Sequence, residues 1–153
     1  MTSVYSIVPP SSKVVWFYAL VVLILALTAG YLTASAWKAR RMHVELSGTG
    51  VTAMGEYSRF VSRDMLRASE ARVVDLTRDT DFALRLRTNG SGLPGYQVGW
   101  FETRAEGKIF AMVTDPHRVV YVPVRDAPGL LLSVANPERF IHDLRERSGN
   151  AGS

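Results

Sequence analysis

Residues 96–124 read YQVGWFETRAEGKIFAMVTDPHRVVYVPV and hold three short apolar runs separated by turn-forming residues. The runs are residues 96–103, 108–113 and 118–124. Runs of this length, rich in β-branched and aromatic residues, are typical of β-strands. The linkers at residues 105–107 and 114–117 are short and rich in turn formers. They therefore favour antiparallel pairing of successive strands.

The same pattern continues on both sides of this stretch. Residues 42–46 (MHVEL) alternate between apolar and polar side chains, as a half-buried strand does. The sequence GTG at residues 48–50 then favours a turn, and residues 51–57 follow as a second strand of a predicted hairpin. Two further predicted strands are residues 71–76 and, after the turn at 126–129, residues 130–134.

A helix is predicted at the end of the chain, over about residues 137–147. Asn136 is a suitable N-cap, and Pro137 suits the first helical position. Its apolar face comprises Phe140, Ile141 and Leu144. Residues 148–153 are predicted to form a flexible tail. Short antiparallel strands followed by one amphipathic helix predict a small barrel or sandwich with the helix over one opening.

An uncharged apolar segment precedes these strands. Residues 14–36 contain no charged side chain over about 23 positions, whereas a helix needs about 20 to cross a bilayer core. We therefore predict an N-terminal segment over residues 1–13 and a transmembrane helix over residues 14–37. Aromatic residues near its two ends suit the two membrane interfaces: Trp16, Tyr18, Tyr31 and Trp37. A buried core helix would rarely be apolar on every side in so small a protein.

Basic residues flank this segment unequally. Lys13 precedes it, and Lys38, Arg40 and Arg41 follow it. The positive-inside rule therefore predicts an inner-membrane protein whose C-terminal domain is cytoplasmic. A cleaved signal peptide is the alternative, because residues 34–36 (ASA) match a small-x-small cleavage site. The apolar run is longer than the usual signal core of about 7–15 residues.

Composition limits the remaining possibilities. The chain has 153 residues, so roughly 110 remain after the apolar segment, enough for one domain over residues 38–147. Lysine and arginine total 18 against 14 acidic residues, without a basic run of the kind that binds nucleic acid. The sequence has no cysteine, which excludes disulfides and thiolate metal sites.

One glycine-rich motif matches a nucleotide-binding pattern only formally. Residues 90–95 (GSGLPG) fit G-x-G-x-x-G, but the dinucleotide fingerprint needs a strand before it and a helix after it. A predicted strand follows this motif instead. We therefore interpret the glycines as residues of a long loop that need positive φ or a close backbone approach.

Metal-binding and catalytic patterns are not found in the sequence. His43, His117 and His142 are far apart and lack the spacing of a zinc or iron motif. Asp79 and Asp81 lack the glycine and glutamate of a calcium loop. The sequence GxSxG, which marks a nucleophilic serine, is absent. We accordingly expect no metal, no cofactor and no catalytic residue.

Two segments resemble bacterial PH-like domains: residues 87–101 (RTNGSGLPGYQVGWF) and residues 132–140 (LSVANPERF). The resemblance extends over about residues 42–144. It implies a mainly β, pleckstrin-homology-like fold, with a strongly bent antiparallel sheet or partly open barrel, a C-terminal capping helix and a preceding transmembrane helix. Members often carry membrane helices, but their biochemical role is largely undefined, so the resemblance implies no particular ligand.

These observations predict a membrane-tethered, non-catalytic binding or scaffold module that contacts a protein or peptide at the membrane. The bilayer itself is the expected partner of the N-terminal helix, and no nucleic acid is expected. Candidate contact residues in the predicted loop and the strand after it are Arg85, Arg87, Asn89, Tyr96 and Trp100. Two alternatives stay open: a sensor of anionic lipid headgroups, which would use the basic residues after the helix and the loop of Arg85 and Arg87, and an enzyme with an unrecognised site.

Overall fold

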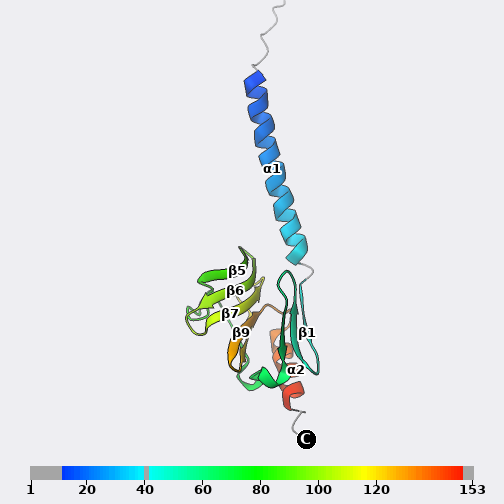
Figure 1. Cartoon of the computed structure of the whole chain (residues 1–153), viewed down its shortest axis with the longest axis vertical. Helices are drawn as coiled ribbons and strands as arrows, with labels where there is room; N and C mark the ends of the chain where they lie inside the picture. The colour runs from blue at the N-terminus through cyan, green and yellow to red at the C-terminus, as the bar shows by residue number, and fades with distance from the viewer. Residues whose placement is uncertain (1–11, 40–41, 150–153) are drawn as a thin grey trace, which may run out of the picture. The chain divides into compact units, whose positions relative to one another are not determined.

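The computed structural model describes residues 12–39 and 42–149, except for the side chains of residues 35, 36, 38 and 39. The chain divides into two units, Met1–Trp37 and Lys38–Ser153 (Figure 1). Helix α1, Ser12–Ala39, accounts for the described part of the first unit and extends two residues beyond it. Its segment Ser12–Ala34 is long and apolar enough to cross a membrane, and its apolar window is not buried. By length and composition, such a segment also fits a signal sequence.

The second unit contains two β-sheets and a C-terminal helix, so the predicted mainly β fold is confirmed. The smaller sheet has the antiparallel order β1-β2-β3, with β1 His43–Leu46, β2 Gly50–Met54 and β3 Arg59–Ser62. The larger sheet has the order β4-β8-β9-β7-β6-β5. Its strands are β4 Arg72–Val74, β5 Leu86–Leu93, β6 Tyr96–Thr103, β7 Gly107–Val113, β8 Val119–Val124 and β9 Ala127–Leu132. Two short 3₁₀ helices, η1 (Arg63–Met65) and η2 (Ala68–Glu70), link the sheets, and α2 (Pro137–Gly149) ends the described domain.

One predicted strand pairing is wrong. The short linker at residues 114–117 indicated that β7 and β8 are antiparallel neighbours, but β9 lies between them. Strand β9 is antiparallel to β8 and parallel to β7, where Phe110 pairs with Leu130. Every residue of β8 and the last four residues of β9 are buried. Strands that are apolar on both faces belong at the centre of a sheet, which explains the insertion of β9.

A second difference concerns residues 85–95, which were predicted to be a loop. Residues Leu86–Leu93 instead form strand β5, which pairs with β6 along its length. Most side chains of β5 are exposed, so its sequence lacks the apolar alternation by which strands are recognised. Strand β3 was likewise not predicted, because its four residues give too short a pattern.

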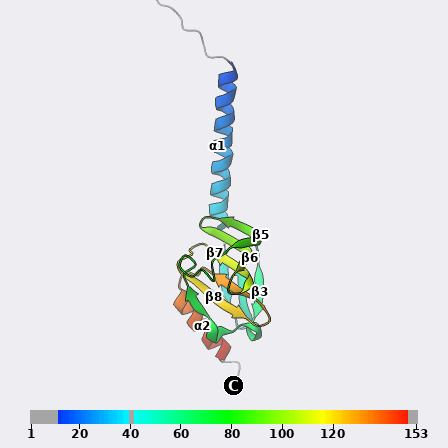
Figure 2. The same ribbon diagram turned by 90° about the vertical axis from the view of Figure 1, so that its left-hand side faces the viewer.

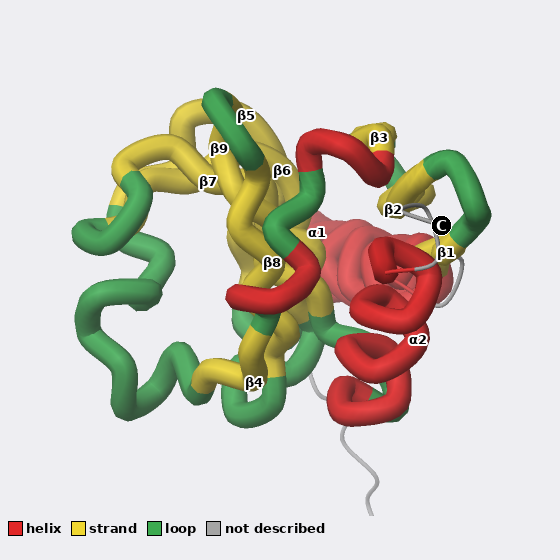
Figure 3. Tube along the Cα trace, turned by 90° about the horizontal axis from the view of Figure 1, so that it is seen from below, coloured by secondary structure: helices red, strands yellow, loops and turns green. Residues whose placement is uncertain are grey.

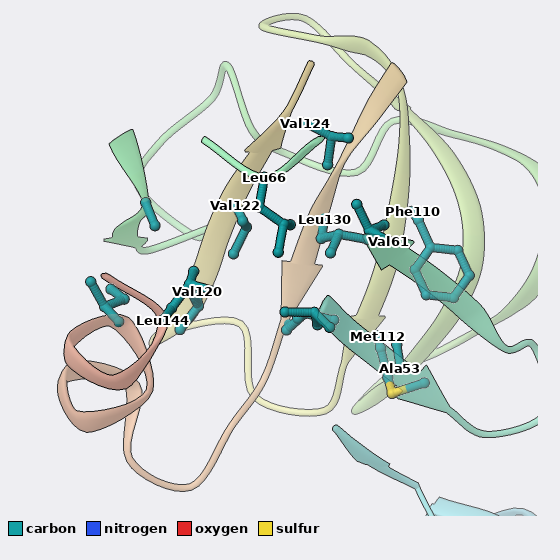
Figure 4. Close-up of a cluster of buried hydrophobic side chains, with 14 of the residues drawn as sticks. Ala53, Val61, Leu66, Phe110, Met112, Val120, Val122, Val124, Leu130 and Leu144 are labelled. Atoms are coloured by element: carbon teal, nitrogen blue, oxygen red, sulfur yellow. The ribbon is translucent and has the colours of Figure 1, made fainter. Parts of the chain in front are cut away.

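The main hydrophobic core lies between the two sheets and beneath α2 (Figure 4). Phe110 and Leu130 come from the larger sheet, Val51 from the smaller sheet and Leu144 from α2, and all four are almost fully buried. Burial of each large apolar side chain contributes about 1.5–3 kcal/mol to folding. The predicted cap of α2 is present, since the Arg139 N–H donates to Asn136 Oδ1 at 3.3 Å.

A second apolar cluster covers the other face of the larger sheet. The long connection between β4 and β5 runs over this face, on the side away from α2 (Figure 3), and places Phe82 against Tyr121 with their ring centres 4.6 Å apart. The Tyr121 hydroxyl donates to the Glu106 carboxylate. Burial, with a smaller contribution from this hydrogen bond, raises the pKa of Tyr121 well above its ordinary value.

This pKa shift predicts a loss of stability at alkaline pH. The folded state holds the Tyr121 proton more tightly than the unfolded state does. The resulting stabilisation of the folded state is complete below about pH 10 and declines as the pH rises further. We expect Tyr121→Phe to make the free energy of unfolding less dependent on pH above about pH 10. Urea denaturation of the full chain in detergent, at several pH values, measures this dependence. Equal pH dependence in the two proteins would contradict the expected role of Tyr121.

Candidate functional site

Strand β5 is an edge of the larger sheet (Figure 2). It pairs with β6 from Leu86↔Glu102 to Leu93↔Tyr96, and no other described strand pairs with its opposite side. The register shifts between Arg87 and Asn89. At this bulge the Thr88 hydroxyl donates to the Trp100 carbonyl oxygen at 3.2 Å. An edge strand of eight residues presents unpaired backbone groups that are able to hydrogen-bond to another extended chain.

Three of the predicted contact residues lie on this exposed edge. Arg85, Arg87 and Asn89 are all exposed, and Leu86 between the two arginines is 58% exposed. Within the described part of the chain, neither arginine has a carboxylate within ion-pair distance. The β5 edge, by which we mean residues 85–93 and their free backbone side, therefore combines uncompensated positive charge with an accessible apolar side chain.

The other two predicted contact residues lie on β6, where Tyr96 is buried and Trp100 is partly exposed at the margin of the main core. Tyr96 is 6% exposed, and its hydroxyl donates to Glu56 Oε2 at 3.2 Å. Burial, reinforced by Glu56, raises the pKa of Tyr96. Trp100 is half-buried and packs edge-on against Phe110, with 5.3 Å between the ring centres.

Two basic residues beside Trp100 were not predicted from the sequence. The Arg59 Cζ and Lys108 Nζ atoms each lie 4.8 Å from the centre of the Trp100 ring, within the range of cation–π attraction. Arg59 also donates to the carbonyl oxygens of Pro128 and Gly129, at 2.7 and 3.3 Å, and its burial lowers its pKa. No sequence signal marks Arg59, because the four residues of β3 (RFVS) do not alternate. Arg59 and Lys108 add positive charge near the strand that pairs with β5.

Two glycines of the motif, Gly90 and Gly95, have the structural role predicted for them, whereas Gly92 has neither a positive φ nor a close backbone neighbour. Gly90 and Gly99 pair across β5 and β6, and their φ angles are +142° and +125°. A Cβ atom on Gly99 would lie 2.4 Å from the Asn89 carbonyl oxygen. Gly95, in the turn between the strands, has a φ of +72°. A strand follows the motif, so the helix that a dinucleotide site requires is not in that position.

The histidines lie in three separate places. His43 Nε2 is 3.4 Å from Glu45, and His117 Nδ1 is 3.8 Å from Asp75. His142 lies beside Asp143 and Glu146 on α2, a grouping that sequence spacing did not reveal. Its Nδ1 faces Asp143 and its Nε2 faces Glu146, so the two carboxylates contact different nitrogens. This exposed arrangement is typical of surface ion pairs.

The predicted membrane-interface residues belong to α1 and the segment after it. Trp16, Tyr18, Tyr31 and Trp37 are exposed on the helix, as residues facing lipid would be. Lys38 belongs to the helix, but its side chain lies outside the described residues, as do Arg40 and Arg41.

The fold of the domain agrees with a comparison against known families. The bacterial PH domain family matches residues 66–148, a little over half of the chain. The chain belongs to this family. The bacterial PH domain match covers β4 to β9 and nearly all of α2, and it includes residues 87–101 and 132–140, so the resemblance seen in the sequence is confirmed. Curated proteins and solved structures give no match to the chain.

Proposed function

We propose that this protein is a membrane-tethered, non-catalytic module whose β5 edge binds an extended, acidic segment of a protein partner. The observation that carries the proposal is an eight-residue edge strand with a free backbone side and two arginines that have no carboxylate partner in the described chain. Membership of the bacterial PH domain family supports a binding module.

Strand addition suits the chemistry of the β5 edge. A peptide that pairs with an edge strand gains main-chain hydrogen bonds, and its side chains select the edge that they complement. Arg85 and Arg87 favour carboxylates in the added strand, and Leu86 offers an apolar contact on the opposite face of the strand. Arg59 and Lys108 lie beside Trp100 and strengthen the positive potential around this part of the sheet.

Helix α1 supports the proposed membrane tethering. Its apolar segment suits a bilayer, and three basic residues after it against one before it favour a cytoplasmic domain at the inner membrane. Insertion of α1 restricts the domain to the region near the membrane. This raises its effective concentration toward partners on the same membrane, so that a weak strand-addition contact suffices.

Site-specific photo-crosslinking in native membranes tests the β5 edge. A photo-crosslinking amino acid at Asn89 is expected to give a discrete protein adduct, whereas the same group at exposed Thr80, in the connection after β4, gives none. Charge reversal by Arg85→Glu and Arg87→Glu is expected to lower the adduct yield by about tenfold or more, because like charges oppose an acidic partner. Arg139→Glu, on the exposed face of α2, is the matched control and should leave the yield unchanged.

Two results would contradict this proposal. Equal protein adducts from positions 89 and 80 would show that contact at the β5 edge is not specific. Adducts with lipid alone, lost in neutral membranes, would favour the sensor of anionic headgroups instead.

A further inference from the structure

A concavity at another place in the domain has the composition of an oxyanion site. It encloses about 810 Å³ and is bordered by η2, the turn between β8 and β9, and the C-terminal end of α2. The side chains that matter here are Arg67, Glu70, Arg125, Arg145 and Ser148. We call this concavity the arginine pocket.

Backbone pairing brings Arg67 and Arg125 to the same side. Leu66 and Val124 form an isolated antiparallel bridge, and both of their side chains are buried in the main core. The Arg67 N–H donates to the Pro123 carbonyl at 3.0 Å, and the Arg125 N–H donates to the Met65 carbonyl at 2.7 Å. Side chains alternate along extended chain, so the residues after Leu66 and Val124 point away from that core and toward the pocket.

Arg145 is held in place by carbonyl groups and has no carboxylate partner among the described residues. Its Nε donates to the Ala68 oxygen at 3.3 Å, and its Nη2 donates to the oxygens of Ser69 and Ala71 at 3.4 and 2.9 Å. Carbonyls fix the position of the guanidinium and leave its full charge uncompensated.

The pocket also contains a polar atom without a partner. Ser148 Oγ is buried and makes no hydrogen bond, and it is the one such side-chain atom in the described residues. A buried hydroxyl in that state destabilises the fold unless a ligand or water bonds to it. The single carboxylate in the lining, Glu70, lies 3.6 Å from Arg67, and both side chains are about half exposed, so it compensates Arg67 only weakly. Asp64, outside the lining, attracts Arg125, but hydrogen bonds from Ser62 and the backbone lower its pKa more than Arg125 does.

We propose that the arginine pocket binds a phosphate group. Guanidinium groups match phosphate oxygens in geometry and charge, and the Ser148 hydroxyl supplies a further donor. The C-terminus of α2 carries the partial negative charge of the helix dipole, which disfavours an anion. Arg63 Nη1 donates to the Arg147 carbonyl at 3.1 Å and offsets part of this negative charge. The phosphate group belongs either to a small soluble compound or to a lipid headgroup. In both cases, binding in the arginine pocket is independent of the function proposed for the β5 edge.

Thermal unfolding of the full chain in neutral detergent tests this site with inorganic phosphate as the probe. At constant ionic strength, replacement of chloride by phosphate is expected to raise the unfolding midpoint saturably. Arg125→Gln should weaken the apparent phosphate affinity by about tenfold, because a charged hydrogen-bond donor is lost. Arg87→Gln on the β5 edge is the matched control and should bind phosphate as the unaltered chain does.

Ser148→Ala separates ligand binding from folding. This variant should unfold no more easily than the unaltered chain without phosphate, and it should bind phosphate about threefold more weakly. The proposal is overturned if phosphate gives no saturable response, if Arg125→Gln behaves like Arg87→Gln, or if Ser148→Ala binds phosphate normally.

Reconstitution distinguishes the two sources of phosphate. In vesicles of phosphatidylcholine with phosphatidic acid, a bound headgroup would abolish the response to added inorganic phosphate, relative to phosphatidylcholine alone. An unchanged response in both vesicles would assign the pocket to a soluble phosphate compound.

Discussion

Replacement of Leu23 and Leu27 together by arginine is expected to release the full-length chain from membranes. Both leucines lie in the middle of the apolar segment of α1, and both are exposed on the helix. Each arginine near the centre of a membrane helix costs about 2.5–3.5 kcal/mol on insertion scales. Two arginines, together with the loss of two favourable leucines, raise the free energy of membrane insertion by roughly 6 kcal/mol. This increase exceeds the favourable insertion free energy of the remaining apolar residues.

Alkaline carbonate extraction followed by sedimentation measures this effect. The unaltered chain should stay in the pellet, whereas the double variant should appear mainly in the supernatant. Arginine at Val14 and Thr33, near the ends of the segment, is the matched control, because long basic side chains there reach the interface. An unaltered chain that is itself extracted would contradict the membrane-spanning role of α1. Mass measurement of the mature chain identifies cleavage, which would make the segment a signal peptide.

Replacement of Gly99 by alanine is expected to destabilise the domain by about 2–4 kcal/mol. The added Cβ atom would lie 2.4 Å from the Asn89 carbonyl oxygen and 2.6 Å from the Gly90 Cα atom, and the φ of +125° is itself unfavourable for alanine. Both close atoms belong to the backbone of β5, so relief of the contact requires the edge strand to move away from β6. The same variant should therefore also lower crosslinking from Asn89.

Two other glycines provide graded controls for this result. Gly107 has a φ of +68° but open space where an added Cβ atom would lie, so Gly107→Ala carries only the conformational cost, of about 1 kcal/mol. Gly48 has neither constraint, and its alanine variant should be nearly neutral. Urea denaturation of each full-length variant in detergent should rank their losses as Gly99, Gly107 and Gly48. A loss at Gly99 no larger than that at Gly107 would contradict the close approach of β5 and β6.

Local patterns in the sequence were enough to locate most elements. Strands β6, β7 and β8 alternate or run apolar between clear turn residues, so their positions follow from periodicity. Helix α2 begins where the Asn136 cap and Pro137 indicate. These features act over a few residues, which is why they are readable without tertiary information.

The order of strands and the identity of the edge were not readable in this way. Strand β5 is polar because one of its sides faces solvent, and a polar segment that contains Asn89, Gly90 and Gly92 is typical of a loop. The placement of β9 between β7 and β8 depends on which strands must be buried on both faces. Burial of that kind is a property of the whole sheet.

The candidate sites were predictable only in part. Exposure of Arg85, Arg87 and Asn89 agreed with their polar character, whereas the burial of Tyr96 was not apparent from the sequence and Trp100 is partly exposed. The residues of the arginine pocket come from η2, the β8–β9 turn and α2. Residues from three separated segments share no spacing pattern, so only the folded chain brings them together.

The central position of β9 has a consequence for biosynthesis. Helix α1 leaves the ribosome first, but β7 and β8 cannot join into one sheet until residues Ala127–Leu132 have also emerged. A nascent or prematurely terminated chain that ends before β9 would present two unsatisfied apolar strands, although its apolar helix α1 is already complete. Such chains are expected to be aggregation-prone and to be substrates of proteolysis, whereas completion of β9 allows the domain to form in one cooperative step.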